Sequence, residues 1–68
     1  MMNDRERIGV RITELRNSRG LTTRQLAELC GVNYANISKI ENGRYNVSID
    51  ILAKICNALE CEIHILER

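Results

Sequence analysis

The sequence predicts an all-α fold, a compact bundle of four helices that is followed by a short C-terminal β-strand. Four stretches place apolar residues at helical spacing, and residues that can cap a helix precede them; only residues 61–68 change to an alternating pattern. Of the 68 residues, 44% are hydrophobic, so one small core can form without metal or disulfide cross-links. We therefore expect a single domain over residues 1–68.

The first helix is expected over about residues 4–18, with Asn3 or Asp4 as its N-cap. Its apolar stripe has i, i+4, i+7 spacing and consists of Ile8, Ile12 and Leu15. Gly9 lies inside this helix, where glycine costs about 1 kcal/mol relative to alanine. Either another backbone approaches closely at Gly9 or the position is simply exposed, and both interpretations stay open.

The second and third helices are expected over about residues 23–30 and 34–41, joined by a tight turn. The Thr-x-x-Gln pattern at residues 22–25 is a capping box, which fixes where the second helix begins. Gly31 suits the turn because glycine tolerates a positive φ, and Asn33 can cap the third helix. The residues expected to face the core are Leu26, Ala27, Cys30, Ile37 and Ile40.

The outer face of the third helix is the candidate functional surface. A helix about 10–12 Å across fits the major groove of B-DNA, roughly 12 Å wide, where each base pair presents a distinct donor and acceptor pattern. The candidate base-reading residues are Asn33, Tyr34, Ala35, Ser38 and Lys39. The candidate phosphate-contacting residues are Thr23, Arg24, Asn36, Asn42 and Arg44. A helical hairpin with solvated polar faces has the same spacing, so the spacing alone favours neither interpretation.

The fourth helix is expected over about residues 49–59, with Ser48 as its N-cap, and its apolar stripe should close the core. This stripe consists of Ile49, Leu52, Ile55, Cys56 and Leu59.

Residues 61–66 alternate in a way that favours a β-strand. The sequence predicts no second strand, and a lone strand leaves backbone groups unpaired. We therefore expect a homodimer in which two copies pair their strands, with Cys61, Ile63 and Ile65 at the interface. A frayed tail or a short helix is the alternative for this stretch.

Charge is unevenly distributed along a chain whose net charge is only +1. Residues 1–46 carry eight Lys/Arg and five Asp/Glu, whereas residues 47–68 carry two and four. A basic side can meet phosphate while an acidic end points away or meets a partner. Imbalances of this size also arise by chance.

Several classes of protein are disfavoured by the composition. With three cysteines, no secretory segment and no apolar run near 18 residues, we expect a cytoplasmic protein without a membrane span. Cys56, Cys61 and His64 make a weak case for zinc, because a fourth ligand and paired short spacings are missing. The chain has a single histidine and neither a glycine-rich phosphate loop nor a nucleophile-base arrangement. We therefore expect no cofactor, no metal and no enzymatic activity.

Six motifs carry a resemblance to a known family. They are Ile-Thr-Glu-Leu-Arg at 12–16, Arg-Gly-Leu-Thr at 19–22, Gln-Leu-Ala-Glu at 25–28, Gly-Val-Asn at 31–33, Ile-Ser-Lys-Ile-Glu-Asn-Gly at 37–43 and Leu-Ala-Lys-Ile-Cys-Asn-Ala-Leu at 52–59. Through these motifs, roughly residues 5–61 resemble the lambda-repressor-like, Cro- or XRE-type helix-turn-helix domains. The block that ends in Ile-Glu-Asn-Gly is specific to this family.

The resemblance implies a regulator of transcription, most simply a repressor, that binds double-stranded DNA. It also implies a structural ion pair between Arg16 and Glu41. An antitoxin that binds a toxin protein through its acidic C-terminal surface, and DNA through the same fold, is the alternative. Two departures stand out: the family usually has glutamine at the position of Thr23, which suggests a weaker phosphate contact here, and many relatives have a fifth helix where this chain predicts a strand.

Overall fold

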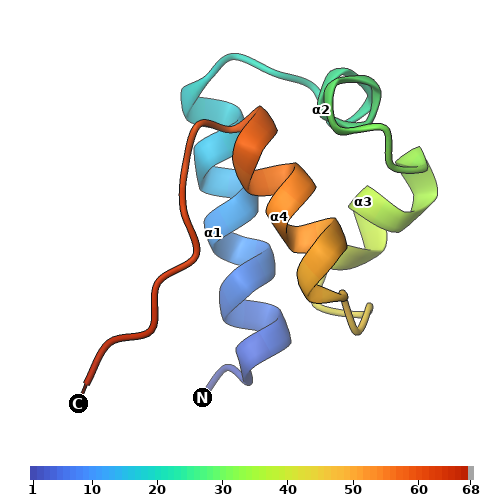
Figure 1. The fold of residues 1–68 in the computed structure, drawn as a ribbon. Coiled ribbons are helices and arrows are strands. Elements are labelled where there is room, and N and C mark those ends of the chain that lie inside the picture. The colour runs from blue at the N-terminus through green and yellow to red at the C-terminus, as the bar shows by residue number, and fades with distance from the viewer. Residues whose placement is uncertain (68) are drawn as a thin grey trace.

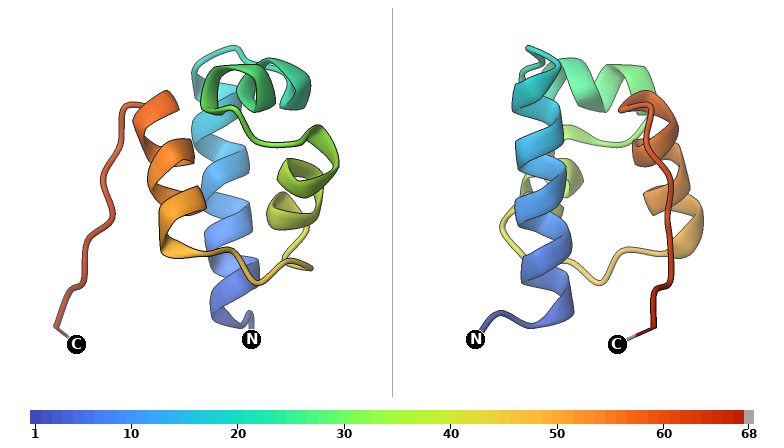
Figure 2. Two further views of the ribbon diagram at one scale, coloured as in Figure 1. Left: turned by 45° about the vertical axis from the view of Figure 1, so that its right-hand side comes forward. Right: turned by 90° about the vertical axis from the view of Figure 1, so that its left-hand side faces the viewer.

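The computed structural model describes residues 1–67, which contain four α-helices (Figure 1). The helices are α1 (Asp4–Ser18), α2 (Thr23–Cys30), α3 (Tyr34–Glu41) and α4 (Ile49–Ala58). α1 packs on α3, and α2 packs on both α3 and α4. The two further views show α2 lying across one end of the molecule and both chain termini at the other end (Figure 2). The predicted four-helix fold is confirmed.

Polar side chains begin each helix, as the sequence predicts. Asn3, rather than Asp4, caps α1 and forms a capping box with Glu6, and Thr22 forms the same arrangement with Gln25 on α2. The Asn33 side chain accepts a hydrogen bond from the backbone N–H of Ala35 at 2.7 Å. Ser48 accepts one from the N–H of Ile51 at 3.2 Å. These bonds satisfy N–H groups that a helix start otherwise leaves unpaired.

One apolar core lies between the four helices. It consists of Ile12, Leu26, Ala27, Cys30, Ile37, Ile40, Ile55 and Leu59. The prediction for Ile49 is wrong, because this side chain is 71% exposed. Ile49 is the first residue of α4, and its side chain faces solvent at the end of the helix. In the first turn of α4 it is Ile51 and Leu52 that pack against the core.

At Gly9 the backbones of α1 and α3 approach closely. It is buried in α1, and a Cβ atom built on it would lie 2.4 Å from the carbonyl oxygen of Ile40 and 2.6 Å from that of Glu41. Gly43 ends α3 at φ +71°, and a Cβ there would lie 2.8 Å from Cγ of Glu6. The open question about Gly9 is therefore settled in favour of a close approach, because both glycines let the end of α3 lie against α1.

After α4 the chain turns back along the bundle. Glu60 has a positive φ of 56°, and the backbone N–H of Cys61 donates to the carbonyl of Cys56 at 2.9 Å. Within the described part of the chain no strand is assigned, and residues 61–67 are without regular secondary structure. The predicted strand is thus not confirmed, and its pairing with a second copy stays a prediction. No helix in residues 1–67 combines the length and the apolar character needed to span a membrane.

Candidate nucleic-acid interface

The two faces of α3 differ sharply in exposure. Ile37 is fully buried and Ile40 is 2% exposed, so these two residues attach the helix to the core. On the other side Tyr34 is 42% exposed. Asn33, Ala35 and Lys39 are also exposed, and Ser38 is half-buried. Four of the five candidate base-reading residues therefore lie exposed together at or near one surface of this helix.

The turn before α3 fixes the direction in which this surface points. Gly31 ends α2 in the left-handed conformation at φ +69°, and its N–H donates to the carbonyl of Ala27. The N–H of Val32 donates to the same carbonyl at 3.2 Å, and the Val32 side chain packs against the core. These two hydrogen bonds to one carbonyl, together with the packing of Val32, define the path of the chain from α2 into α3.

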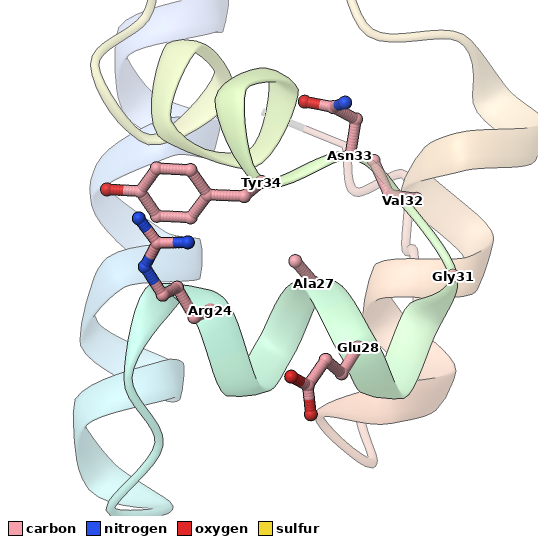
Figure 3. A pocket seen from close by; sticks show the side chains of 7 residues that line it. All are labelled: Arg24, Ala27, Glu28, Gly31, Val32, Asn33 and Tyr34. Atoms are coloured by element: carbon pink, nitrogen blue, oxygen red, sulfur yellow. The ribbon is translucent and has the colours of Figure 1, made fainter.

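A hollow of about 470 Å³ lies between α2 and the start of α3 (Figure 3). Its lining residues are Arg24, Ala27, Glu28, Gly31, Val32, Asn33 and Tyr34. Across it the guanidinium carbon of Arg24 lies 4.2 Å from the centre of the Tyr34 ring, which is a cation–π contact. Both residues were candidates for DNA contact from the sequence, but their contact with each other was not predicted.

The C-terminal end of α3 is held by a charged cluster. Arg16 donates from Nε to Oε2 of Glu41 at 2.7 Å and from Nη2 to Oε1 at 3.0 Å, and the two side chains are only 13% and 9% exposed. Its Nη1 also donates to the carbonyl of Leu21 at 2.8 Å. Hydrogen bonding to the Glu41 carboxylate raises the pKa of Arg16, although burial acts in the opposite direction.

Thr13 completes this cluster, and the sequence analysis missed it. Its hydroxyl lies 3.0 Å from Oε1 of Glu41 and 2.9 Å from the carbonyl oxygen of Gly9. Gly9, Thr13 and Arg16 recur at i, i+4 and i+7, so they share one side of α1. This helical spacing could have predicted that the three residues act together. It was not recognised because the three residues are a glycine and two polar residues, whereas helix faces were identified from apolar residues.

The candidate phosphate-contacting residues lie at both ends of α3. Arg24 and the half-buried Thr23 belong to the first turn of α2, beside the start of α3. Arg44 and Asn42 follow the other end of α3 and are exposed. The Asn42 side chain already donates to the carbonyl of Ser38 at 2.8 Å. The fifth residue of the set, Asn36, lies within α3 and is half-buried.

The predicted dimer residues lie on a different part of the molecule. Cys61 is half-buried, whereas Ile63 is 45% and Ile65 98% exposed. The C-terminal segment borders a groove of about 390 Å³ whose other walls come from α1 and α4. A second copy bound along this segment would therefore use a surface other than the outer face of α3.

The fold and the exposed outer face of α3 define a helix-turn-helix protein of the DNA-binding, transcription-regulating class. Residues 12–66 match the family HTH_3, described as helix-turn-helix, and the chain belongs to this family. A search of curated proteins finds no match.

Solved structures of regulators have the same fold. The restriction-modification controller protein C.AhdI from Aeromonas hydrophila is 36% identical, with a TM-score of 0.84 over 87% of this chain and 89% of that one. The clp gene regulator ClgR from Corynebacterium glutamicum is 37% identical, with a TM-score of 0.83 over 87% of this chain and 76% of that one. The controller protein C.Esp1396I is 28% identical, with a TM-score of 0.81 over 85% and 76% of the two chains.

Proposed function

We propose that this protein is a sequence-specific repressor of transcription that binds double-stranded DNA as a homodimer and reads the major groove with α3. The observation that supports this proposal most strongly is the contrast between the two faces of α3. Ile37 and Ile40 are buried, while Tyr34 and Lys39 on the other side are exposed and free to meet a large partner. In helix-turn-helix complexes the second helix lies in the major groove with its N-terminal residues at base edges.

The exposed side chains have the chemistry needed to distinguish bases. Lys39 can donate to O6 and N7 of guanine, and the Ala35 methyl group can contact the methyl group of thymine. The oxygen of the Asn33 side chain is occupied by the N–H of Ala35, so this residue would read bases through its NH₂ group. Tyr34 adds a ring at the helix start. Each strong base contact contributes about 1–3 kcal/mol of discrimination.

Contacts to phosphate would come from the residues around α3 and would fix the register of the protein on the duplex. Arg44, just beyond the C-terminal end of the helix, is the strongest candidate because it is cationic and exposed. Asn42 and Asn36 can add weaker hydrogen bonds. At the other end Thr23, in the first turn of α2, belongs to the same group.

A dimer would double the number of Lys and Arg side chains that can contact DNA phosphates. Affinity for B-DNA falls by about 0.9 log units for each phosphate neutralised when the salt concentration rises tenfold, so binding at physiological salt needs many contacts. The apolar side chains of Ile63, Ile65 and Leu66 are 45%, 98% and 82% exposed. A large exposed apolar patch is typical of a surface that binds another protein. We propose that the same segment of a second copy, with Cys61 at its start, covers these side chains.

Selection of bound duplexes from a random pool tests this function. We expect a palindromic motif whose half-sites lie about one helical turn, or roughly 34 Å, apart. Sedimentation of the free protein and of its complex gives the number of copies bound. Recovery of an unbiased pool would refute sequence-specific reading, and a single half-site bound by one copy would refute the dimer.

The antitoxin alternative rests on the same exposed segment. Glu62 and Glu67 flank its apolar side chains, and a basic toxin protein would suit this mixture of charge and apolar surface. Co-purification from the native cell separates the two proposals. A stoichiometric second protein that is lost when residues 62–68 are deleted would favour the antitoxin, whereas a homodimer alone would favour the repressor.

A further inference from the structure

We infer that Arg24 reads a guanine in the major groove, and that the ring of Tyr34 holds its guanidinium group in place for this contact. Arg24 is then a specificity-determining residue rather than a phosphate contact. This inference rests on the proposed function, because it requires that the start of α3 enters the groove. It adds a guanine to the base pairs that α3 itself reads.

The geometry joins two elements at one point. Arg24 is the second residue of α2, and Tyr34 is the first residue of α3. The guanidinium carbon of Arg24 lies 4.2 Å from the centre of the Tyr34 ring (Figure 3). The Glu28 carboxylate, which also borders the hollow, lies well apart from this pair (Figure 3). Within residues 1–67 no hydrogen bond or ion pair occupies the N–H groups of Arg24.

A guanidinium group placed over a ring is suited to read a base. The ring contacts the guanidinium group without accepting a conventional hydrogen bond, and no other group in residues 1–67 does so, so the N–H donors of Arg24 are free. Those donors form a rigid fork that matches O6 and N7 of guanine, which is the commonest specific contact in the major groove. An arginine that is already held in place also loses less side-chain entropy on binding than a freely moving one.

The position of the Tyr34 ring indicates that Arg24 contacts a base rather than a phosphate. N-terminal residues of the reading helix meet base edges, whereas the first helix of the motif crosses the DNA backbone. Arg24 belongs to that first helix, α2, but its guanidinium group lies over a side chain of the reading helix. Tyr34 is the first residue of that helix and is 42% exposed. A guanidinium group 4.2 Å from the ring centre enters the groove with it. Arg44, which follows the other end of α3, has no such neighbour among the residues described.

The test compares selected sequences for the wild type, Arg24→Ala and Arg24→Lys. We expect the wild type to prefer guanine at one position of each half-site, and Arg24→Ala to lose that preference by roughly 5- to 150-fold while the rest of the motif is retained. Arg24→Lys should keep the charge but lose part of the preference, because a lysine ammonium can donate to guanine but lacks the planar fork that the Tyr34 ring holds in place. Arg44→Ala is the matched control and should weaken all sequences alike.

Two further measurements, one with a guanine analogue and one with Tyr34 variants, test the contact more specifically. Replacement of that guanine by 7-deazaguanine removes N7 without changing base pairing, and it should weaken the wild type but not Arg24→Ala. Tyr34→Phe keeps the ring and should keep the guanine preference, whereas Tyr34→Ala should reduce it. Because both side chains are exposed, circular dichroism melting should show these variants to be folded.

The outcomes separate this inference from the function on which it rests. A wild-type motif that Arg24→Ala leaves intact, with all sequences bound more weakly, would make Arg24 a phosphate contact and overturn the inference alone. Equal binding of guanine and 7-deazaguanine by the wild type would also overturn it. Absence of any selected motif for the wild type would remove the proposed function and this inference together.

Discussion

Arg16 and Glu41 form a two-point ion pair that ties the last turn of α1 to the last residue of α3. The Nε–Oε2 distance is 2.7 Å and the Nη2–Oε1 distance is 3.0 Å, and the side chains are 13% and 9% exposed. Planar guanidinium and carboxylate groups match in this arrangement, which fixes orientation as well as distance. The C-terminal end of α3 is thus fixed against α1 by a contact between residues that are 25 positions apart in the sequence.

Glu41→Ala should destabilise the protein strongly. It leaves the mostly buried Arg16 charge without its partner, which typically costs about 3–5 kcal/mol. A small domain has only about 5–15 kcal/mol of stability in total, so we expect the melting temperature to fall by more than about 10 °C. Binding to DNA should weaken in parallel. Thermal melting followed by circular dichroism measures the first effect, and titration with a selected duplex measures the second.

The matched control is Glu14→Ala, which breaks an ion pair within α1. Arg11 Nη1 and Glu14 Oε1 lie 3.5 Å apart, and their side chains are 68% and 60% exposed. Exposed pairs contribute only about 0–1 kcal/mol. Equal losses for Glu41→Ala and Glu14→Ala, or no loss for Glu41→Ala, would show that the buried pair does not hold α3.

Gly9→Ala should destabilise the fold, although the same substitution in an exposed helix stabilises by about 1 kcal/mol. The new Cβ would lie 2.4 Å from the Ile40 carbonyl oxygen, so α1 and α3 would have to move apart. Overpacking of this kind costs about 1–3 kcal/mol. Urea denaturation measures the change, with Val10→Ala at the neighbouring exposed position as control. A Gly9→Ala protein more stable than the wild type would contradict the close approach.

Lys39→Ala and Arg44→Ala should affect DNA binding in different ways. Loss of a base contact should change which sequences are preferred, whereas loss of a phosphate contact should weaken all sequences and lower the slope of log affinity against log salt by about 0.9. Titrations of two duplexes at several salt concentrations distinguish these effects. If both variants keep the wild-type preference and salt slope, neither residue has the assigned role.

Ile65→Lys should dissociate the predicted homodimer. This side chain is 98% exposed in one chain, and a charge at the centre of a small paired sheet would be buried without a partner. Sedimentation at micromolar concentration should show a monomer. Leu29→Lys is the control, because Leu29 is 62% exposed but lies on α2. A dimer that survives both Ile65→Lys and deletion of residues 62–68 would place the interface elsewhere.

Cys56 should give the free energy of unfolding an alkaline pH dependence. Burial, together with hydrogen bonding to Cys61, raises the pKa of the Cys56 thiol from 9.0 to about 11. The neutral thiol is therefore favoured by folding: its contribution is complete below pH 9 and is lost as the pH rises toward 11. Urea denaturation at several pH values measures this loss. Cys56→Ala should lower stability at neutral pH but show a shallower decline above pH 9; an unchanged decline would contradict burial of the thiol.

Local signals were sufficient to predict the helices. The predicted N-cap at the start of α1, the capping box at Thr22 and the turn at Gly31 depend on neighbours within three or four residues, which the sequence displays directly. That Asn3 rather than Asp4 is the cap, and that it forms a capping box with Glu6, was not predicted. The buried side of α3 also followed from spacing, because Ile37 and Ile40 are three residues apart. The ion pair between Arg16 and Glu41 was predicted from the family resemblance rather than from residue spacing.

Contacts between different helices could not be predicted from these local patterns. The hydroxyl of Thr13 meets a carboxylate 28 residues away, and Nε of Arg19 donates to the carbonyl of Leu59, 40 residues away, at 2.8 Å. The stacking of Arg24 on Tyr34 depends on the angle of a turn, which periodicity does not specify. Ile49 was misassigned for a related reason: a residue in the first turn of a helix can match the apolar period and still face solvent.

Selection of duplexes from a random pool by the wild-type protein, followed by methylation interference at guanine N7, tests the entry of α3 into the major groove most directly. The expected result is a palindromic motif in which methylation in the major groove blocks binding at the positions that Lys39→Ala and Arg24→Ala alter. A motif that no substitution on the outer face of α3 changes, or binding that guanine N7 methylation leaves unaffected, would contradict it.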